Sequence, residues 1–256
     1  MIDTRTDIHP SARIAPHVTI GPWTVIGPDV EIGEGTEIGS HVVIQGSTRI
    51  GKNNKIFQFA SVGADPQDKK YQGEKTLLNI GDNNVIREFC TLNRGTTQGG
   101  GVTQIGDGNL FMAYVHIAHD CLLGNNIIFA NGVTLAGHVR VNDFSIVGGL
   151  VAVHQFCTIG AHSFIAGGSV RIVKDVLPFL LISDQAEPCG LNREGLKRRG
   201  FTPETLLYLR RAYKVIFRQG LTIPQAIDTL QEMIIACPEI SLLIEGLEKS
   251  ERGVLR

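Results

Sequence analysis

The chain has 256 residues, 43% of them hydrophobic, which is enough for one large domain or for one domain with a small appendage. Its net charge of −1 excludes a general electrostatic attraction to nucleic acid, so we expect no nucleic-acid partner. Aromatic residues are few and glycines are many, 30 in all, which argues against an ordinary β-sandwich or helical bundle.

The start of the chain and its cysteines indicate where in the cell the protein is expected. No charged segment followed by an apolar one stands at the start, so a secretory signal is not expected. No apolar run approaches the roughly 20 residues that cross a membrane. The five cysteines are odd in number and widely spread, which is typical of reduced thiols. We therefore expect a cytoplasmic protein without a membrane span.

An aliphatic or aromatic residue recurs at every sixth position through most of the chain. The series runs from Ile8 to Val62, resumes from Ile80 to Leu92, and resumes again from Ile105 to Ile165. A period of six fits neither an α-helix nor an alternating strand. It is typical of a parallel β-helix, in which each hexad forms one short strand and a corner and about 18 residues make one coil.

The register breaks twice, at about residues 64–79 and 94–104. Insertions in a solenoid leave the stack as loops, and such loops commonly carry function. The first insertion, "ADPQDKKYQGEKTLLN", is rich in polar and charged side chains. We therefore favour a functional loop there over a plain surface excursion.

The hexads give way to helices near the C-terminal end. Helix-start residues at Thr202–Glu204 and at Thr222 predict two helices, and a third follows. We expect residues 1–189 to form the β-helix with its two loops, and residues 190–256 to form a C-terminal α-helical domain.

The coil repeat places separate motifs side by side, because residues 18 apart stand one above the other. The motif "VHIAHD" carries two histidines and an aspartate at residues 115–120. Its second histidine should stack on a glycine of the next coil, with more polar residues one coil further. The predicted patch consists of His116, His119, Gly137, His138, His154 and Gln155.

Three interpretations of this patch stay open from the residues alone: a solvated histidine column, a metal site, or a general base. No two histidines are five apart, unlike the close pair of a β-helix carbonic anhydrase. A histidine can take a proton from an alcohol near neutral pH, and Asp120 beside His119 could fix its tautomer. The Gly137 backbone N–H could stabilise an oxyanion. We favour the general base, with no metal and no cofactor.

The chain resembles the UDP-N-acetylglucosamine acyltransferase family of lipid A biosynthesis, within the hexapeptide-repeat transferase superfamily. The resemblance runs essentially from end to end and rests on "HIAHDC", "LAGHV", "QDKKYQGE", "NRGTTQGGG", "EGLKRRGF" and "RGVLR". It implies a homotrimer of left-handed parallel β-helices with active sites between subunits. The implied reaction moves an (R)-3-hydroxyacyl chain from acyl carrier protein to the glucosamine 3-hydroxyl of UDP-N-acetylglucosamine.

The resemblance also implies roles for single residues. His119 matches the general base, Asp120 its partner and Gly137 the oxyanion donor. The positions that match contacts to the sugar, the acyl 3-hydroxyl or the active-site pocket are Gln67, Asp68, Lys70, His116, His138 and His154. The positions that match the nucleotide-binding region are Gln155, Asn192, Glu194, Arg198 and Arg199.

Two positions bear on specificity. Gly167 matches the position that limits acyl length, and a glycine leaves the groove open, so a longer 3-hydroxyacyl donor is predicted. Asn93 stands where many relatives have a histidine, and an asparagine does not titrate near neutrality. A 3-amino sugar nucleotide is therefore an alternative acceptor, although we favour the hydroxyl.

Basic residues of the C-terminal region suit two acidic ligands. Arg198 and Arg199 suit the diphosphate of UDP. The basic residues of the next predicted helix suit the acidic carrier protein, and they are Arg210, Arg211, Lys214 and Arg218. Two rival interpretations are an acetyl-CoA-dependent sugar acetyltransferase and a non-catalytic β-helix scaffold. A related N-acyltransferase of the same pathway carries an additional N-terminal domain, for which hexads beginning at about residue 8 leave no room.

Overall fold

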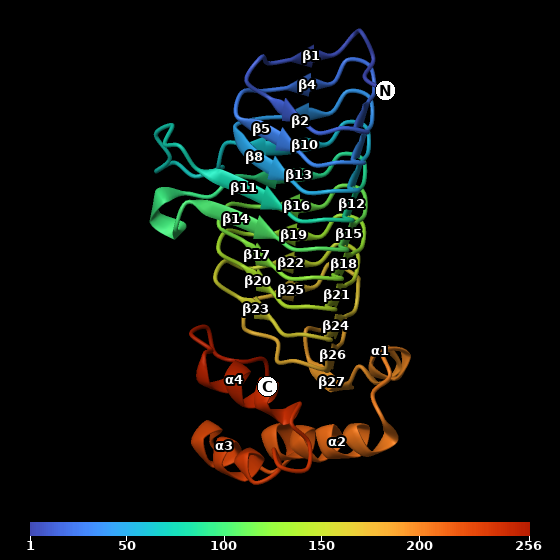
Figure 1. Ribbon diagram of the computed structural model, residues 1–256. Coiled ribbons are helices and arrows are strands. Elements are labelled where there is room, and N and C mark those ends of the chain that lie inside the picture. Colours follow the sequence, from blue (N-terminus) through green and yellow to red (C-terminus); the bar gives the residue numbers. More distant parts are fainter.

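A computed structural model describes residues 1–256 and shows a triangular prism of short strands with four helices packed at one end (Figure 1). Three parallel sheets, A, B and C, form the faces of the prism, and successive strands pass from sheet B to C to A. The predicted β-helix with a helical tail is therefore confirmed.

The strands of each sheet follow one another down the prism. Sheet B consists of β1 (Asp7–Ile8), β4 (Val25–Ile26), β7 (Val43–Ile44), β10 (Ser61–Ala64), β13 (Thr91–Asn93), β16 (His116–Ile117), β19 (Thr134–Leu135), β22 (Ala152–Val153) and β25 (Arg171–Ile172). Sheet C consists of β2 (Arg13–Ile14), β5 (Val30–Ile32), β8 (Ser47–Ile50), β11 (Leu77–Ile80), β14 (Val102–Ile105), β17 (Leu122–Leu123), β20 (Arg140–Val141) and β23 (Thr158–Ile159). Sheet A consists of β3 (Thr19–Ile20), β6 (Glu37–Ile38), β9 (Lys55–Ile56), β12 (Val85–Ile86), β15 (Leu110–Phe111), β18 (Ile128–Phe129), β21 (Ile146–Val147), β24 (Phe164–Ile165), β26 (Leu180–Ile182) and the antiparallel β27 (Pro188–Leu191).

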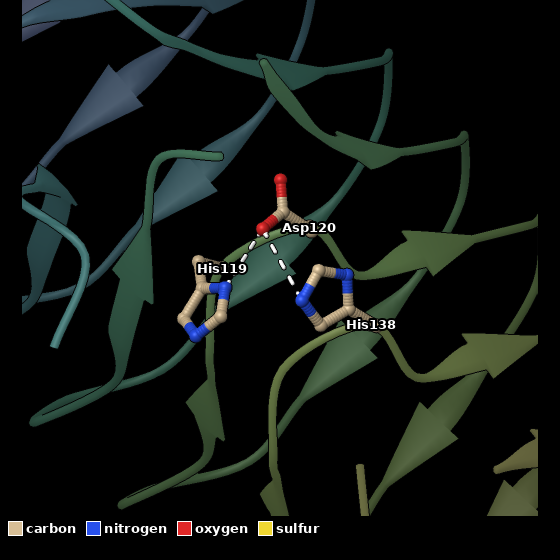
Figure 2. Close-up of side chains that lie close together, drawn as sticks. All are labelled: His119, Asp120 and His138. Atoms are coloured by element: carbon tan, nitrogen blue, oxygen red, sulfur yellow. Dashed lines mark hydrogen bonds and ion pairs between the residues drawn. The ribbon is translucent and has the colours of Figure 1, made fainter. Parts of the chain in front are cut away.

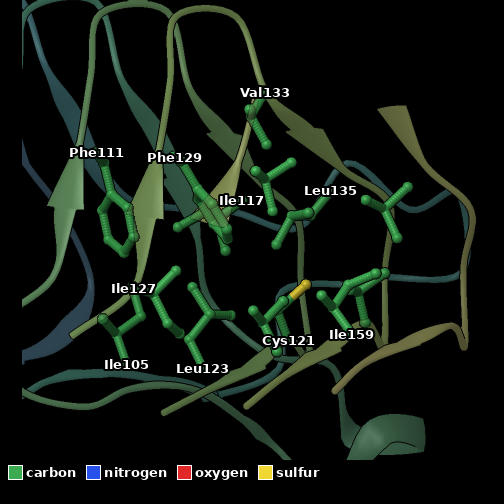
Figure 3. Packing of buried hydrophobic residues seen from close by; sticks show 14 of the residues in the cluster. Ile105, Phe111, Ile117, Cys121, Leu123, Ile127, Phe129, Val133, Leu135 and Ile159 are labelled. Carbon is green, nitrogen blue, oxygen red and sulfur yellow. The ribbon is translucent and has the colours of Figure 1, made fainter. Parts of the chain in front are cut away.

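The residue at every sixth position faces the interior of the prism. Ile117 pairs with Leu135, and Leu135 pairs with Val153, so these three stand in one column at intervals of one coil. All three are buried in a single core that runs the length of the prism. Figure 3 shows Ile117 and Leu135 packed within it. Each such aliphatic side chain contributes about 1.5–3 kcal/mol on burial, and the summed contribution fixes the coil register.

The chain turns between sheets at three edges, which we name edge BC, edge CA and edge AB after the sheets they join. Many corner residues have a left-handed backbone even where they are not glycine, including Asp120 at edge BC. Edge AB carries stacked aromatic rings, with Phe59 5.3 Å from Phe89 and Phe89 4.9 Å from Tyr114 between ring centroids. This stacking offsets part of the cost of the left-handed corners.

Both insertions leave the prism at edge BC. Residues 65–76 join β10 to β11, and residues 94–101 join β13 to β14 and contain the short helix η1 (Thr97–Gly99). Both loops are shorter than predicted. Residues 77–79 and 102–104 are strand, because β11 and β14 pair with each other in register along their whole lengths.

The helices close the far end of the prism. They are α1 (Arg193–Arg198), α2 (Pro203–Arg218), α3 (Ile223–Gln231) and α4 (Ile240–Glu248). The predicted helix starts are confirmed, since Thr202 caps α2 and Thr222 caps α3. After α4 the chain returns to the prism, where Val254 bridges Asp175. No helix has both the length and the apolarity that crossing a bilayer requires.

Candidate active site

His119 and Asp120 form a hydrogen-bonded pair at edge BC, directly after β16. Nδ1 of His119 lies 2.7 Å from Oδ2 of Asp120 (Figure 2). The left-handed backbone of Asp120 turns its side chain back over the corner, and its amide donates to Thr103 Oγ1 at 2.8 Å. Nδ1 therefore carries the proton, and the accessible Nε2 keeps a free lone pair that can accept one.

The Asp120 carboxylate is deeply buried, with 1% of its side chain exposed. Thr96 reaches it twice, because its amide donates to Oδ1 at 2.7 Å and its hydroxyl donates to Oδ2 at 2.6 Å. Burial raises the pKa of Asp120, but the hydrogen bonds from His119 and Thr96 outweigh burial and the pKa is lowered. Asp120 is thus a carboxylate that can stabilise an imidazolium form of His119.

Gly137 stands one coil beyond His119, as the register predicts. A Cβ atom at Gly137 would lie 2.5 Å from Cε1 and 2.8 Å from Nε2 of the His119 ring, so only glycine leaves room for the ring here. The Gly137 amide donates no hydrogen bond within the chain. Gly137 therefore packs against the His119 ring and keeps a free N–H group.

His138 forms a cluster with His119 and Asp120. Its Nε2 lies 3.7 Å from Oδ2 of Asp120, and its ring stacks on Phe156 with 4.5 Å between centroids. Burial lowers the pKa of His138, although the charges of Asp120 and Asp68 oppose the effect. His138 is therefore mainly neutral near pH 7 and suits hydrogen bonding to a substrate.

The other two histidines of the predicted patch lie outside this cluster. His116 points outward from sheet B, with Nδ1 2.7 Å from Thr91 Oγ1, and burial lowers its pKa. His154 lies one coil beyond Gly137, where its Nδ1 is 3.2 Å from Nη2 of Arg252 in the C-terminal tail. Gln155 follows it and is exposed.

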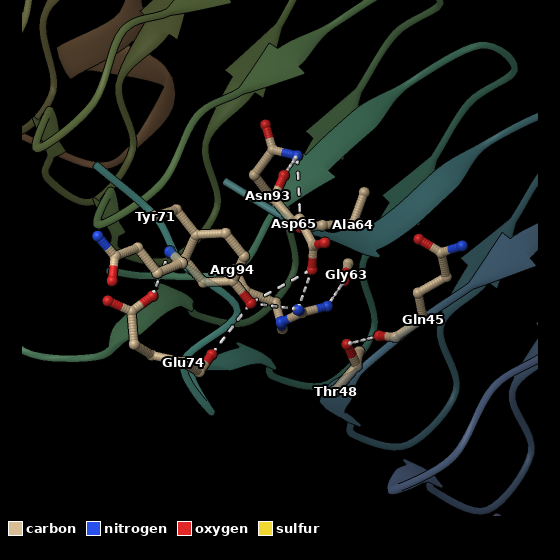
Figure 4. A network of polar contacts seen from close by, with 10 residues as sticks. Gln45, Thr48, Gly63, Ala64, Asp65, Tyr71, Glu74, Asn93 and Arg94 are labelled. Carbon is tan, nitrogen blue, oxygen red and sulfur yellow. Dashed lines mark hydrogen bonds and ion pairs between the residues drawn. The ribbon is translucent and has the colours of Figure 1, made fainter. Parts of the chain in front are cut away.

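The first loop, residues 65–76, is fixed at its base by a buried arginine (Figure 4). Arg94 donates to the Gly63 carbonyl, to the Asp65 carboxylate and, at 3.0 Å, to the Tyr71 hydroxyl. Asn93 adds a bond from Nδ2 to the Asp65 carbonyl at 2.9 Å. The side-chain amide of Asn93 thus anchors the loop that carries Gln67, Asp68 and Lys70.

Four of the five residues predicted to bind the nucleotide lie on or next to α1, away from the His119–Asp120 dyad. The fifth, Gln155, lies at edge BC. Asn192 caps α1 and also donates to the His162 carbonyl at 2.9 Å, whereas Glu194 is exposed and pairs with Lys197. The guanidinium of Arg199 lies over the ring of Phe144, a corner residue of edge CA. Within one chain the dyad and the α1 residues therefore belong to different edges.

A groove of about 1130 Å³ connects these two edges across the outer surface of sheet C. Asp120, His138 and Phe156 line it at edge BC, and Phe144 and His162 line it at edge CA. The α4 region forms a further wall. The groove is large enough for an organic ligand that reaches from the dyad to the edge where Arg199 packs.

The donor set of the cluster fits a metal ion poorly. Ligand atoms of His119, Asp120 and His138 lie within 4.8 Å of one another, which is near enough for a metal. Both oxygens of Asp120, however, already accept short hydrogen bonds, one of them from Nδ1 of His119. An ion would have to displace these bonds, so the pair is better suited to moving a proton.

Comparisons with known proteins identify the family. Residues 175–255 match the model described as "Udp N-acetylglucosamine O-acyltransferase; Domain 2", and residues 7–46 and 103–137 match bacterial transferase hexapeptide repeats. The chain is 53% identical to the acyl-(acyl-carrier-protein)–UDP-N-acetylglucosamine O-acyltransferase of Verminephrobacter eiseniae, over 98% of this chain and 100% of the relative. This chain belongs to the UDP-N-acetylglucosamine O-acyltransferase family.

Other relatives and solved structures agree with this family. The Stutzerimonas stutzeri enzyme of the same name is 52% identical over 100% of this chain and 99% of its own length. The structure of LpxA from Acinetobacter baumannii superposes with a TM-score of 0.97 at 52% identity, covering 100% and 99% of the two chains. The UDP-N-acetylglucosamine acyltransferase of Francisella novicida gives a TM-score of 0.98 at 46% identity, covering 100% and 94%. The chain is therefore an acyltransferase with a left-handed parallel β-helix.

Sequence reasoning missed Thr96 and Arg94, the two residues that fix the dyad and the first loop. Both lie in the stretch "NRGTTQGGG", which the hexad pattern marks only as an interruption. Their partners are 24 and 29 residues away, and no periodicity relates them.

Gly137→Ala tests the packing of the dyad. The added methyl group would displace the His119 ring, and a displacement of about 1 Å can lower kcat about 10²-fold. Steady-state acyltransfer kinetics would measure the effect, with circular dichroism to verify the fold. If the alanine variant kept the kcat of the wild type, catalysis would not depend on the observed position of the His119 ring.

Proposed function

We propose that this chain transfers an (R)-3-hydroxyacyl chain from acyl carrier protein to the glucosamine 3-hydroxyl of UDP-N-acetylglucosamine, the first step of lipid A biosynthesis. The observation that carries the proposal is the His119–Asp120 pair, whose imidazole ring packs against Gly137, a residue with a free amide. No metal or cofactor takes part in the chemistry that we assign.

The reaction follows from this arrangement. Nε2 of His119 takes the proton from the sugar hydroxyl as its oxygen attacks the thioester carbonyl, and Asp120 stabilises the imidazolium. The oxyanion of the tetrahedral intermediate accepts a hydrogen bond from the Gly137 amide. When the intermediate collapses, the carbon–sulfur bond breaks and the leaving thiolate takes the proton back from His119. An ester and a carrier-protein thiol result, and the base is restored.

The first loop and the neighbouring histidines hold the reacting groups. Asp68 is near enough to influence the pKa of His138, which supports a shared role in binding the sugar. We assign the sugar and the acyl 3-hydroxyl to the residues around this point, which are Gln67, Asp68, Lys70, His116, His138 and His154.

The nucleotide belongs near α1. Nη1 of Arg199 is buried without a hydrogen-bond partner, so it has a donor to offer a phosphate. Arg198 is exposed beside it. We assign the UDP moiety to Gln155, Asn192, Glu194, Arg198 and Arg199.

We propose a homotrimer assembled through sheet A. The outward-facing positions of six successive strands form an apolar row on this sheet, namely Val85, Leu110, Ile128, Ile146, Phe164 and Leu181. A continuous apolar row on an outer face is typical of an interface. In a threefold assembly this face meets a different surface of the next copy, which can bring separate edges of two chains to one active site.

The carrier protein would dock on α2. Its exposed basic residues share one side of the helix and are Arg210, Arg211, Lys214 and Arg218. Because acyl carrier protein is acidic, electrostatic attraction would speed the encounter and weaken with salt. A cytoplasmic location, which we also propose, agrees with this donor and with the five free cysteines.

We assign the acyl chain to sheet B and its far end to Gly167 at edge AB. Crossing sheet B from the dyad takes about five residues, or about 16 Å, so a long chain can lie along it. Gly167 already packs closely, because a Cβ there would lie 2.9 Å from the Gly149 amide nitrogen. A larger side chain at residue 167 would therefore press on the Gly149 backbone, and we expect it to occupy the end of the path.

A product assay tests the function directly. UDP-N-acetylglucosamine and its 3-amino analogue would each be incubated with a series of 3-hydroxyacyl carrier proteins and with acetyl-CoA, and products identified by mass spectrometry. We expect the 3-O-hydroxyacyl ester, and in His119→Ala a loss of about 10²–10⁴-fold in kcat. Exclusive use of the amine or of acetyl-CoA, or full turnover by His119→Ala, would reject the proposed reaction.

Gly167→Met tests the acyl path with the same series of donors. We expect the preferred donor to shift to shorter chains, with the shortest donors still turned over. Because the new side chain presses on Gly149, thermal unfolding would verify that the variant is folded. An unchanged order of preference in a folded variant would place the chain elsewhere.

Ile146→Glu tests the interface. A charge in the middle of the apolar row should dissociate the trimer, since burying an unpaired carboxylate is costly. Thr19→Glu is the matched control, because it adds the same charge at the outward position of β3, at the polar end of the same sheet. Sedimentation velocity would give the mass of each variant. A trimer of Ile146→Glu as stable as the control would mean that another face forms the contact.

A further inference from the structure

Thr96 has no role in the reaction described so far, yet its buried hydroxyl is hydrogen-bonded to Asp120 of the dyad. It is 1% exposed, and its hydroxyl accepts a hydrogen bond from the Gly99 amide at 3.2 Å. With that lone pair in use, the single hydroxyl proton is directed at Asp120 Oδ2, 2.6 Å away. Thr96 thus holds the same carboxylate oxygen to which His119 donates.

The loop that carries Thr96 covers the carboxylate closely. A Cβ atom at Gly99 would collide with the carboxylate carbon and both oxygens of Asp120, so the loop packs directly on this group. Two residues before Thr96, the buried Arg94 ties the start of the loop to Gly63 and to the first loop. The loop is therefore held at its start by Arg94 as well as by its contacts with Asp120.

A second histidine, His138, also faces Oδ2 of Asp120, so the orientation of the carboxylate matters. Nε2 of His138 lies 3.7 Å from Oδ2 of Asp120, so it competes with His119 for the same oxygen. The two bonds from Thr96 fix the rotation of the carboxylate, with Oδ1 toward the Thr96 amide and Oδ2 toward His119. Without the hydroxyl, Thr96 keeps only its amide bond to Oδ1, and Oδ2 loses one of its two restraints against turning toward His138.

We propose that Thr96 is a positioning residue for the acyl transfer: it holds the Asp120 carboxylate so that Oδ2 accepts its hydrogen bond from His119 and not from His138. The proposal rests on the proposed function, because it assigns Thr96 a part in activating His119. It does not place Thr96 in contact with either substrate.

Thr96→Val tests the proposal, since valine keeps the shape and removes the donor. We expect kcat to fall about 10-fold or more, with the KM for UDP-N-acetylglucosamine nearly unchanged. Thr96→Ser restores the hydroxyl and should recover most of the rate. Thr97→Val is the matched control, because Thr97 is the exposed next residue and its side chain makes no hydrogen bond. It should behave as the wild type.

A double-mutant cycle separates positioning from simple stability. In an Asp120→Asn background, Thr96→Val should cost little further activity, because the group that Thr96 orients is already lost. Additive losses, a change in KM alone, or a serine variant as slow as the valine variant would overturn the assignment. Thr96→Ala replaces the valine variant if the latter does not fold.

The activity of the wild-type chain separates a failure of the proposed function from a failure of the role assigned to Thr96. A wild-type chain that acylates none of the acceptors would reject the proposed function and the role of Thr96 with it. Wild-type turnover together with an unaffected Thr96→Val would reject the role of Thr96 alone.

Discussion

The stacking of each coil on the one before it is the constraint on which the whole molecule depends. Inward aliphatic columns such as Ile117, Leu135 and Val153 set the period, and the period decides which corner residues become neighbours. The proposed active site follows from this stacking, because His119 meets Gly137 only through the register of adjacent coils. It also requires the glycine, since any side chain at that corner would occupy the space of the imidazole ring.

The two breaks in the repeat serve the site that the repeat builds. Both loops leave at edge BC, the edge that carries the dyad, so they reach the histidines of the following coils. One brings Asp68 near His138, and the other covers Asp120 and supplies two hydrogen bonds to it. A carboxylate alone on the outside of a solenoid would be solvated and free to rotate. Under the second loop it is buried, ionised and fixed, which suits it to orient the base that we propose, His119.

Much of the fold and part of the site could be predicted from the sequence, for identifiable reasons. A strict period of six has few structural solutions, and capping residues such as Thr202 act locally. The dyad could be inferred because its two members are adjacent and its glycine is one coil away. Thr96 and Arg94 could not, because their bonds join a loop to a distant coil across an irregular spacing. The loop ends were predicted too long since strand pairing between β11 and β14 overrides the hexad pattern.

The protonation of His119 in the resting enzyme tests the central claim most directly. Nitrogen-15 NMR of histidine-labelled protein, in mildly alkaline buffer and with His119→Gln for assignment, reports which ring nitrogen carries the proton. We expect a His119 ring protonated at Nδ1, hydrogen-bonded to Asp120, with a free Nε2. A ring protonated at Nε2 would contradict it, because that nitrogen could then not take the proton of an attacking hydroxyl.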